Sequence, residues 1–251
     1  QMSRLLKARL RQGFRTIKMP PDVNPLPGTF RGLPALDLAK CNKGCTGCID
    51  ACPTGAISFD GGLKLDLGKC VFCPSCGEAC KAGAVRFTQD YSLTSTSREG
   101  LVLSEKNLRP KVEELGGEMK RLFGRSLKLR EISAGGCNAC EADLNVLSTV
   151  GWDLGRFGIQ FVASPRHADG IVVTGPIPRN MFDAVRSTYE AVPAPKLVIL
   201  VGTCAISGGV FSGSPAVAGM PEEIKPDLFI PGCPPHPLTT LDALLKLLGR
   251  L

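Results

Sequence analysis

The sequence predicts two folded parts: a C-terminal α/β domain with a doubly wound parallel sheet, and a smaller N-terminal α+β domain rich in cysteine. From Leu127 onward, short apolar segments alternate with helical stretches, which is typical of a parallel sheet covered by helices. Eight of the twelve cysteines fall between Cys41 and Cys80, before that alternation begins. A chain of 251 residues has room for two modest domains.

The cysteine-rich segment is an internal repeat. Cysteine, Gly-Ala, aliphatic and Phe positions in residues 45–59 match those in residues 73–87 at an offset of 28 residues. The second half reads C-x2-C-x2-C-x3-C and the first half nearly so. This run holds a [4Fe-4S] cluster with three close thiolates while its fourth cysteine reaches the other cluster. The apolar residues after the two runs, 56–59 and 84–87, predict short strands beside the clusters.

The crossed fourth cysteines predict two ligand sets. The first set is Cys41, Cys45, Cys48 and Cys80. The second set is Cys70, Cys73, Cys76 and Cys52. Structural zinc is the alternative because C-x2-C pairs also ligate zinc, but a zinc site needs two such pairs and not a four-cysteine run with a crossed ligand.

This repeat resembles bacterial two-cluster ferredoxins, and more narrowly the ferredoxin-like subunits of respiratory complex I and of membrane-bound hydrogenases. It departs from them in two places. Three residues, 42–44, separate its first two cysteines where two are usual, and Lys81 follows Cys80 where proline is common. Both departures concern loop geometry and not the number of clusters. The resemblance implies a two-[4Fe-4S] ferredoxin domain over residues 36–91.

The N-terminal residues 1–35 predict a basic amphipathic helix followed by a connector. Residues 1–18 carry six basic side chains and no acid, which leaves the rest of the chain near neutrality and argues against a nucleic-acid partner. Apolar side chains recur there at helical spacing, at Leu6, Leu10, Phe14 and Ile17. Such a helix docks onto anionic lipid or a membrane subunit, or it packs against a neighbouring protein.

Five prolines in residues 19–35 predict an extended connector. Within it, residues 28–32 resemble the lead-in of complex I-type ferredoxin subunits. After the repeat, residues 92–126 are expected to form a polar Ser/Thr-rich linker and then a helix between Ser104 and Phe123, although Gly116 and Gly117 in the middle disfavour it.

The spacing of the cysteines and the hydropathy of the chain indicate the compartment in which it works. A disulfide-rich secreted protein is disfavoured because most of the cysteines stand in C-x2-C or C-x3-C groupings and no signal peptide is recognised, so a reducing compartment is expected. The longest apolar run, residues 197–201, is far shorter than the roughly 20 residues that span a bilayer. No transmembrane helix is therefore expected.

Residues 127–251 are expected to form the sheet domain. Its predicted strands are 127–132, 159–162, 170–174, 197–201 and 227–230. Its predicted helices are 142–149, 180–191 and 239–248.

The remaining four cysteines, Cys137, Cys140, Cys204 and Cys233, are expected in loops just past the carboxyl ends of three of these strands. Ligands of open α/β sheets bind at that edge, and flanking glycines let the backbone approach a bulky group closely. The pattern therefore predicts a third metal site. The alternatives are a tetrahedral zinc site, which spacing alone does not exclude, and four unligated core cysteines, whose gathering at one edge would be an unusual accident.

Several motifs in this part resemble the small subunit of membrane-bound [NiFe] hydrogenases of the formate hydrogenlyase type, a family related to the 20 kDa subunit of complex I. The resemblance covers residues 119–251 and is carried by residues 136–141, 157–159, 164–169, 174–176, 207–211 and 231–235. Complex I relatives have two adjacent cysteines where Cys137 and Cys140 are separated by two residues. The resemblance implies a flavodoxin-like domain whose [4Fe-4S] cluster lies nearest the catalytic metal of a separate large subunit.

Together these resemblances imply an electron-transfer subunit with three [4Fe-4S] clusters, peripheral on the cytoplasmic side of a membrane-bound complex. Its expected partners are a [NiFe] large subunit, membrane-embedded subunits, and a donor subunit or soluble ferredoxin. No catalytic metal is expected on this chain. The alternatives are the equivalent subunit of a complex I-like quinone oxidoreductase, and a stand-alone iron-sulfur regulatory or binding module.

Other polar residues near the third site carry weaker predictions. Glu141 and Asp143 follow the cysteine pair and either relay protons or simply suit the first turn of a helix, where acids are favoured by its dipole. His167 and His236 are expected to make structural hydrogen bonds, since the cysteines already complete the sites. No Gly-rich phosphate loop of the G-x-x-x-x-G-K-[ST] kind is present in the sequence.

Overall fold

The computed structural model describes residues 2–13, 15–22, 26–42 and 44–251. A five-stranded sheet forms the C-terminal half, in the order β10-β9-β8-β6-β7. Its strands are β6 (Leu127–Ser133), β7 (Ile159–Phe161), β8 (Gly170–Thr174), β9 (Leu197–Val201) and β10 (Leu228–Ile230). All neighbouring strands run parallel, which confirms the predicted α/β class.

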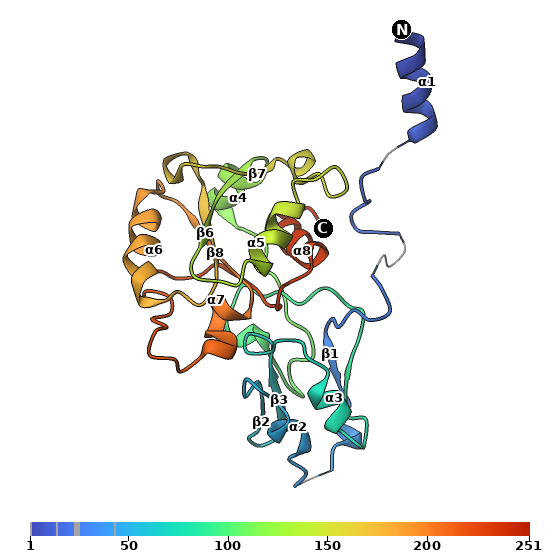
Figure 1. Ribbon diagram of the computed structural model, residues 1–251, viewed down its shortest axis with the longest axis vertical. Coiled ribbons are helices and arrows are strands. Elements are labelled where there is room, and N and C mark those ends of the chain that lie inside the picture. The colour runs from blue at the N-terminus through green and yellow to red at the C-terminus, as the bar shows by residue number, and fades with distance from the viewer. Residues whose placement is uncertain (1, 14, 23–25, 43) are drawn as a thin grey trace.

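Helices cover both faces of this sheet (Figure 1). They are α4 (Gly117–Phe123), α5 (Ala139–Val146), α6 (Arg179–Ala191), α7 (Thr203–Ser207) and α8 (Pro237–Leu247). Every residue of β8 and β9 is buried, as expected where helices pack on both faces. Alternate residues of β8 face opposite sides: Val173 joins the apolar cluster that contains Val185 of α6, and Val172 joins the one that contains Leu241 of α8.

The cysteine repeat folds into two small antiparallel sheets and two short helices. One sheet pairs β1 (Pro34–Leu36) with β4 (Val85–Phe87), and the other has the order β2-β3-β5. The remaining elements are β2 (Ile57–Phe59), β3 (Leu63–Asp66), β5 (Val102–Leu103), α2 (Gly47–Asp50) and α3 (Ser75–Ala79). The strands predicted after each cysteine run are present as β2 and β4. Their partners were not predicted from the sequence.

Short 3₁₀ helices join these elements. They are η1 (Leu38–Lys40), η2 (Glu99–Leu101), η3 (Leu154–Phe157), η4 (Pro165–His167) and η5 (Gly209–Phe211).

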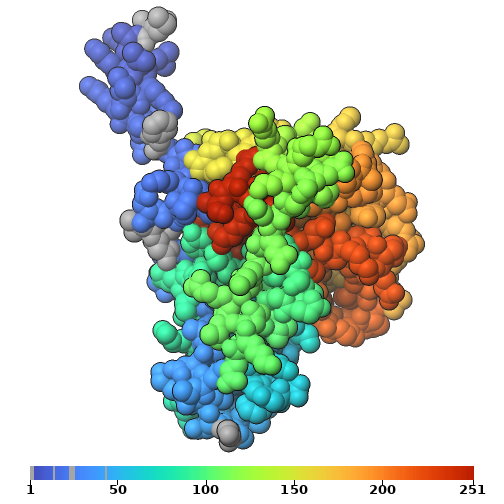
Figure 2. Space-filling model, turned by 180° about the vertical axis from the view of Figure 1, so that it is seen from behind, coloured from blue at the N-terminus to red at the C-terminus, as the bar shows by residue number. Residues whose placement is uncertain are grey.

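The segment after the repeat runs from the lower part of the molecule to the sheet (green in Figure 2). It is more tightly held than a polar linker. Thr94 and Ser95 are buried, and Ser95 exchanges two backbone hydrogen bonds with Phe229 of β10, at 3.2 and 2.9 Å. Buried residues of the repeat, such as Leu65, share one apolar cluster with sheet residues such as Leu200. The two halves of the chain therefore pack through a common core.

The helix predicted between Ser104 and Phe123 is wrong over most of its length, because only α4 forms. Pro110 lacks an N–H, and Gly117 has a left-handed φ of +49° at the start of α4, so the chain before it does not continue as a helix. The apolar spacing instead serves an extended segment. Leu115 donates a hydrogen bond to the Leu247 carbonyl at 2.8 Å and packs on the cluster around α8.

The predicted N-terminal helix is present as α1 (Met2–Gln12) and projects away from the body (Figure 1). It is shorter than predicted. Ile17 lies beyond it, in the connector, where its N–H donates to the Gly151 carbonyl at 2.7 Å; Phe14 lies outside the described residues. Within the described part of the chain, no helix has the length and apolar character needed to cross a membrane.

Candidate metal centres

The first cysteine set lines one cavity of about 340 Å³. Cys41 follows η1, Cys45 lies in the next loop, Cys48 is on α2 and Cys80 follows α3. Burial raises the pKa of the Cys48 thiol, and the neighbouring sulfurs of Cys80, Cys41 and Cys45 raise it further. The structure thus brings these four cysteines together, including the one from the second half of the repeat. Lys43, in the long first spacer, lies outside the described residues.

The second set gathers in the same crossed way. Burial raises the pKa of Cys70 to about 12, and the sulfurs of Cys76, Cys52 and Cys73 add to the increase against a hydrogen bond from the Phe72 N–H. The pKa of Cys76 rises to about 11, through burial first and then through Cys73 and Cys52. Cys48 of the first set also raises the pKa of Cys76, so the two sets adjoin. Their membership in two clusters stays a prediction.

Backbone N–H groups point at three of these sulfurs. The Ala56 N–H donates to Cys52 Sγ and the Ala84 N–H donates to Cys80 Sγ, both at 3.2 Å. These two bonds occupy equivalent places in the repeat, because each joins a fourth cysteine to the residue four positions later. Phe72 N–H donates to Cys70 Sγ at 3.3 Å. Such donors stabilise thiolate over thiol, and they tune the potentials of iron-sulfur clusters.

The third set assembles at the carboxyl edge of the parallel sheet. Cys137 is exposed after β6 and Cys233 is exposed after β10, while Cys140 and Cys204 are partly buried. Burial raises the pKa of Cys140, followed by Glu141 and the sulfurs of Cys204, Cys233 and Cys137. The expectation that all four lie in loops is wrong for two of them. Cys140 and Cys204 sit in the first turns of α5 and α7, because α5 begins at Ala139 and α7 was not predicted.

Glycines make room for the sulfurs themselves. A Cβ on Gly202 would lie 2.5 Å from Cys140 Sγ, and one on Gly209 would lie 3.0 Å from Cys204 Sγ. Both glycines also have positive φ values, 90° and 54°. Larger residues would therefore displace the thiols of the third set.

The three donor sets consist of cysteine thiols alone. Zinc and iron-sulfur clusters both bind four thiolates, so the residue types do not separate them. The cavity between the first four thiols, and donors that are all sulfur, suit iron-sulfur clusters.

Glu141 is held by hydrogen bonds beneath the third set. It is buried, and its Oε1 accepts from Ser133 Oγ at 2.8 Å and from Thr174 Oγ1 at 2.6 Å. Burial favours the neutral acid, but the hydrogen bonds from Thr174, from its own N–H and from Ser133 lower its pKa overall. Asp143 is half-buried, which raises its pKa. A proton-relay role for either residue stays a prediction.

His236 makes the structural hydrogen bond expected of it. Its Nδ1 accepts from the Leu238 N–H at 3.1 Å and caps the start of α8, and its ring packs edge-on against Phe30 and Trp152. His167 is exposed in η4. Thr203, whose hydroxyl contacts the backbone of Cys70, was missed by the sequence analysis because nothing in its spacing marks it.

The structure is an α/β protein with a parallel sheet and four cysteines gathered at the carboxyl edge of that sheet. Residues 137–247, which include these cysteines, match the family described as NADH ubiquinone oxidoreductase, 20 Kd subunit. The chain belongs to this family of complex I 20 kDa and [NiFe] hydrogenase small subunits, whose members are subunits of oxidoreductase complexes. The matched region begins at Cys137, so the cysteine repeat lies outside it.

Three relatives illustrate the family. The probable membrane-bound hydrogenase subunit mbhJ of Pyrococcus furiosus is 37% identical over 144 residues, 57% of this chain and 86% of the relative. Formate hydrogenlyase subunit 7 of Escherichia coli is 40% identical over 56% of this chain and 55% of its own length. A NADH-quinone oxidoreductase subunit from Citrifermentans bemidjiense is 41% identical over 46% of this chain and 68% of its own.

Among solved structures, a chain of the membrane-bound sulfane sulfur reductase, an archaeal respiratory membrane complex, aligns with a TM-score of 0.46 and 30% identity. The alignment covers 53% of this chain and 75% of that one.

Proposed function

We propose that this chain is the electron-transfer subunit of a membrane-associated [NiFe] hydrogenase complex. In this proposal residues 36–91 are a two-cluster ferredoxin domain and residues 127–251 a flavodoxin-like domain. The three cysteine sets would hold three [4Fe-4S] clusters, which supply one-electron transfer when bound. The protein's own part is to fix the spacing of the sites and to surround their sulfurs with backbone donors.

The observation that carries the proposal is the order in which the three sets adjoin. The first set adjoins the second where α2, which carries Cys48, packs on α3, which carries Cys76. The second meets the third through Thr203, which precedes the ligand Cys204 and donates a hydrogen bond to the Cys70 carbonyl. Adjoining cysteine sets on one chain support a path in which electrons would pass through three sites in turn.

The third set faces outward, where we place the large subunit. Cys137 and Cys233 are exposed, and Val210 and Phe211 beside Cys204 expose 59% and 47% of their surface. Exposed apolar side chains around a redox site suit burial by a partner subunit. The reaction, reversible reduction of protons to hydrogen, would take place on the metal centre of that subunit, and no residue of this chain would be catalytic.

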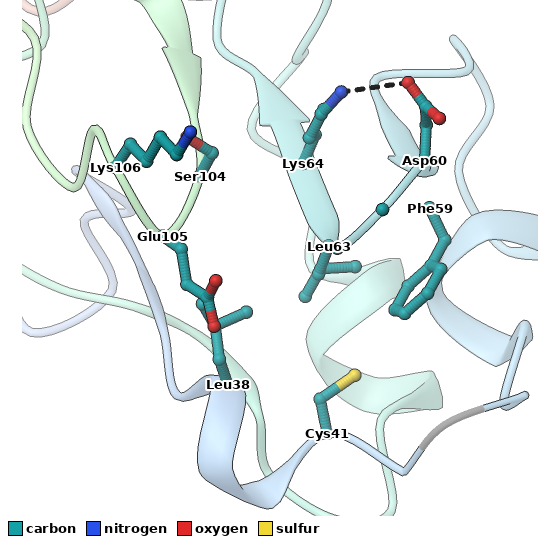
Figure 3. A pocket seen from close by; sticks show the side chains of 11 residues that line it. Leu38, Cys41, Phe59, Asp60, Leu63, Lys64, Ser104, Glu105 and Lys106 are labelled. Atoms are coloured by element: carbon teal, nitrogen blue, oxygen red, sulfur yellow. Dashed lines mark hydrogen bonds and ion pairs between the residues drawn. The ribbon is translucent and has the colours of Figure 1, made fainter.

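The first set is the other end of the path, where a donor subunit or a soluble ferredoxin would dock. Cys45 is exposed, and Cys41 opens into a cavity of about 510 Å³ (Figure 3). Phe59 and Leu63 point into this cavity, and the ion pair of Lys64 with Asp60, at 3.0 Å, stands at its rim. Electrons would pass between the partner and this end of the chain in either direction.

The helix α1 would attach the chain to the cytoplasmic face of the membrane, beside the membrane-embedded subunits. Leu5, Leu6 and Leu10 expose 73%, 64% and 76% of their surface, and the basic side chains lie among them. An exposed apolar stripe with basic neighbours suits an anionic lipid surface. Leu6→Ser with Leu10→Ser should weaken binding of the complex to anionic vesicles. Unchanged binding would assign the helix to a neighbouring protein instead.

Metal and labile-sulfide analysis of the purified complex tests the proposal. We expect about twelve irons on this chain, four for each cluster, and nickel on the large subunit. Iron near eight, or zinc in place of iron at the third set, would contradict it.

The second candidate is the equivalent subunit of a complex I-like quinone oxidoreductase. The match to the NADH-quinone oxidoreductase of Citrifermentans bemidjiense favours it. The same preparation separates the two functions, because a quinone oxidoreductase would contain the iron without nickel and would reduce quinone.

A further inference from the structure

We infer that the Thr203 hydroxyl is a positioning group that fixes the second cysteine set against the third. This inference rests on the proposed function, because it concerns the junction between two of the proposed cluster sites. It assigns a role to a residue that is itself no ligand.

Thr203 connects three of the segments that meet at this junction. Its side chain is buried, with 1% exposed, and its Oγ1 lies 2.7 Å from the Cys70 carbonyl and 3.1 Å from the Gly232 carbonyl. The hydroxyl has one proton, and the shorter contact is the one to Cys70. The backbone N–H of Thr203 donates to the Gly232 carbonyl at 2.9 Å, one residue before Cys233. Thr203 is covalently bonded to Cys204. One residue therefore contacts the chain at Cys70, Cys204 and the loop of Cys233.

The loop that carries Cys70 has little freedom to settle elsewhere. A Cβ on Gly68 would lie 2.8 Å from a methyl group of Ile206, so this loop and α7 pack backbone to side chain. Phe72 holds a left-handed φ of +54°, which is unfavourable for a bulky residue. That conformation lets its N–H donate to Cys70 Sγ while its carbonyl accepts from Arg31 Nε.

The hydrogen bond from Thr203 is the polar connection between the two ligand segments, beside the packing of Gly68 on Ile206. With clusters held by the two sets, the part of Thr203 would be to fix the distance on which one-electron transfer depends, with no bond formed or broken. The rate of such a transfer falls steeply with distance, so a small shift of the Cys70 loop against α7 has a large effect.

The test compares Thr203→Val with Thr203→Ser in the whole purified complex. Valine keeps the shape and removes the hydroxyl, whereas serine keeps the hydroxyl. Thr239→Val is the matched control, because Thr239 is also buried and its hydroxyl has no hydrogen-bond partner among the described residues. The readouts are iron content, the magnetic interaction between the two reduced sites by electron paramagnetic resonance, and the rate at which the third site is reduced after the second.

We expect Thr203→Val to retain its iron, to show an altered magnetic interaction and to slow transfer severalfold. Thr203→Ser should restore both properties, and Thr239→Val should leave both unchanged. Wild-type interaction and rate in Thr203→Val would overturn the inference while leaving the proposed function intact. Equal slowing in Thr203→Ser would overturn it too. Wild-type complex without iron at these two sets would overturn the proposed function itself.

Discussion

In the cysteine repeat, eight thiols come from the forty residues between Cys41 and Cys80, whereas the four thiols beside the sheet come from segments as distant as Cys137 and Cys233. The repeat places its thiols by local loops and two helices of four and five residues. The sheet places its thiols past the ends of β6, β9 and β10, which the backbone hydrogen bonds of one parallel sheet hold in register through β8. The repeat should depend on its metal for order, and the sheet should not.

Removal of iron gives the largest expected difference between the two regions. After chelation under reducing conditions, amides of β2 and β4 should exchange at least about tenfold faster, because the groups that tie their loops are lost. Amides of β8 and β9 should keep their protection, since the apolar cluster around α8 draws its buried members from residues 123 to 248. Hydrogen exchange read by mass spectrometry checks this. Equally faster exchange in both regions would contradict the expectation that only the repeat depends on its metal.

Removing one cysteine ligand from each region tests the difference between the two regions separately. Cys204→Ala and Cys45→Ala should each remove about a third of the iron. Cys204→Ala should abolish hydrogen turnover with an external donor but leave exchange in β2 and β4 at the wild-type rate, whereas Cys45→Ala should speed that exchange. Iron analysis, turnover and hydrogen exchange are measured on the same preparations. Unchanged turnover in Cys204→Ala would exclude the third set from the electron path.

A cavity in the sheet should act on the sheet alone. Ile199 of β9 is fully buried, so Ile199→Ala should lower the free energy of unfolding of this region by about 2–5 kcal/mol. Val150→Ala is the control, because Val150 exposes 75% of its surface, and it should change stability by less than about 0.5 kcal/mol. Denaturant-dependent exchange of β8 amides measures both variants. A comparable loss in β2 would show that the regions unfold together.

The smallest expected effect on stability comes from the carboxyl group of Asp227, beside the sheet. Burial raises the pKa of Asp227, whose carboxylate accepts from the Val198 N–H at 2.8 Å. The folded state then holds its proton more tightly than the unfolded state, so this group's contribution to stability falls as pH rises through its folded pKa. Asp227→Asn keeps an acceptor without the charge. It should raise the melting temperature slightly at neutral pH, with a gain that shrinks as pH falls; a constant gain would contradict a titration effect.

Elements that are marked by a clear hydrophobic pattern could be predicted from the sequence. The segments 170–174 and 197–201 are β8 and β9 with the predicted bounds, because each contains a short apolar run and is followed directly by a glycine, Gly175 or Gly202. The crossed cysteine sets could be proposed from their spacing. The structure brings the same groups together, because each fourth cysteine follows a short helix that turns the chain toward the other site.

What the sequence could not show depends on contacts between distant segments. The spacing of Val112, Leu115 and Met119 suited a helix, yet the first two lie in an extended segment that packs on the cluster around α8. Helix α7 has five residues, too few for a recognisable period, so Cys204 was expected in a loop. Thr203 could not be predicted, because its proposed role depends on the fold that places the Cys70 carbonyl next to its hydroxyl.

The two backbone hydrogen bonds between Ser95 and Phe229 also affect how other chains can approach the sheet. Without them, β10 would end the sheet as an open edge, and open edges invite strands from other molecules. Ser95 occupies that position, so a second chain would have to displace the segment around Ser95 before it could extend the sheet at β10. Strand addition by a neighbouring subunit, if it occurs, has to begin at the opposite margin, along β7.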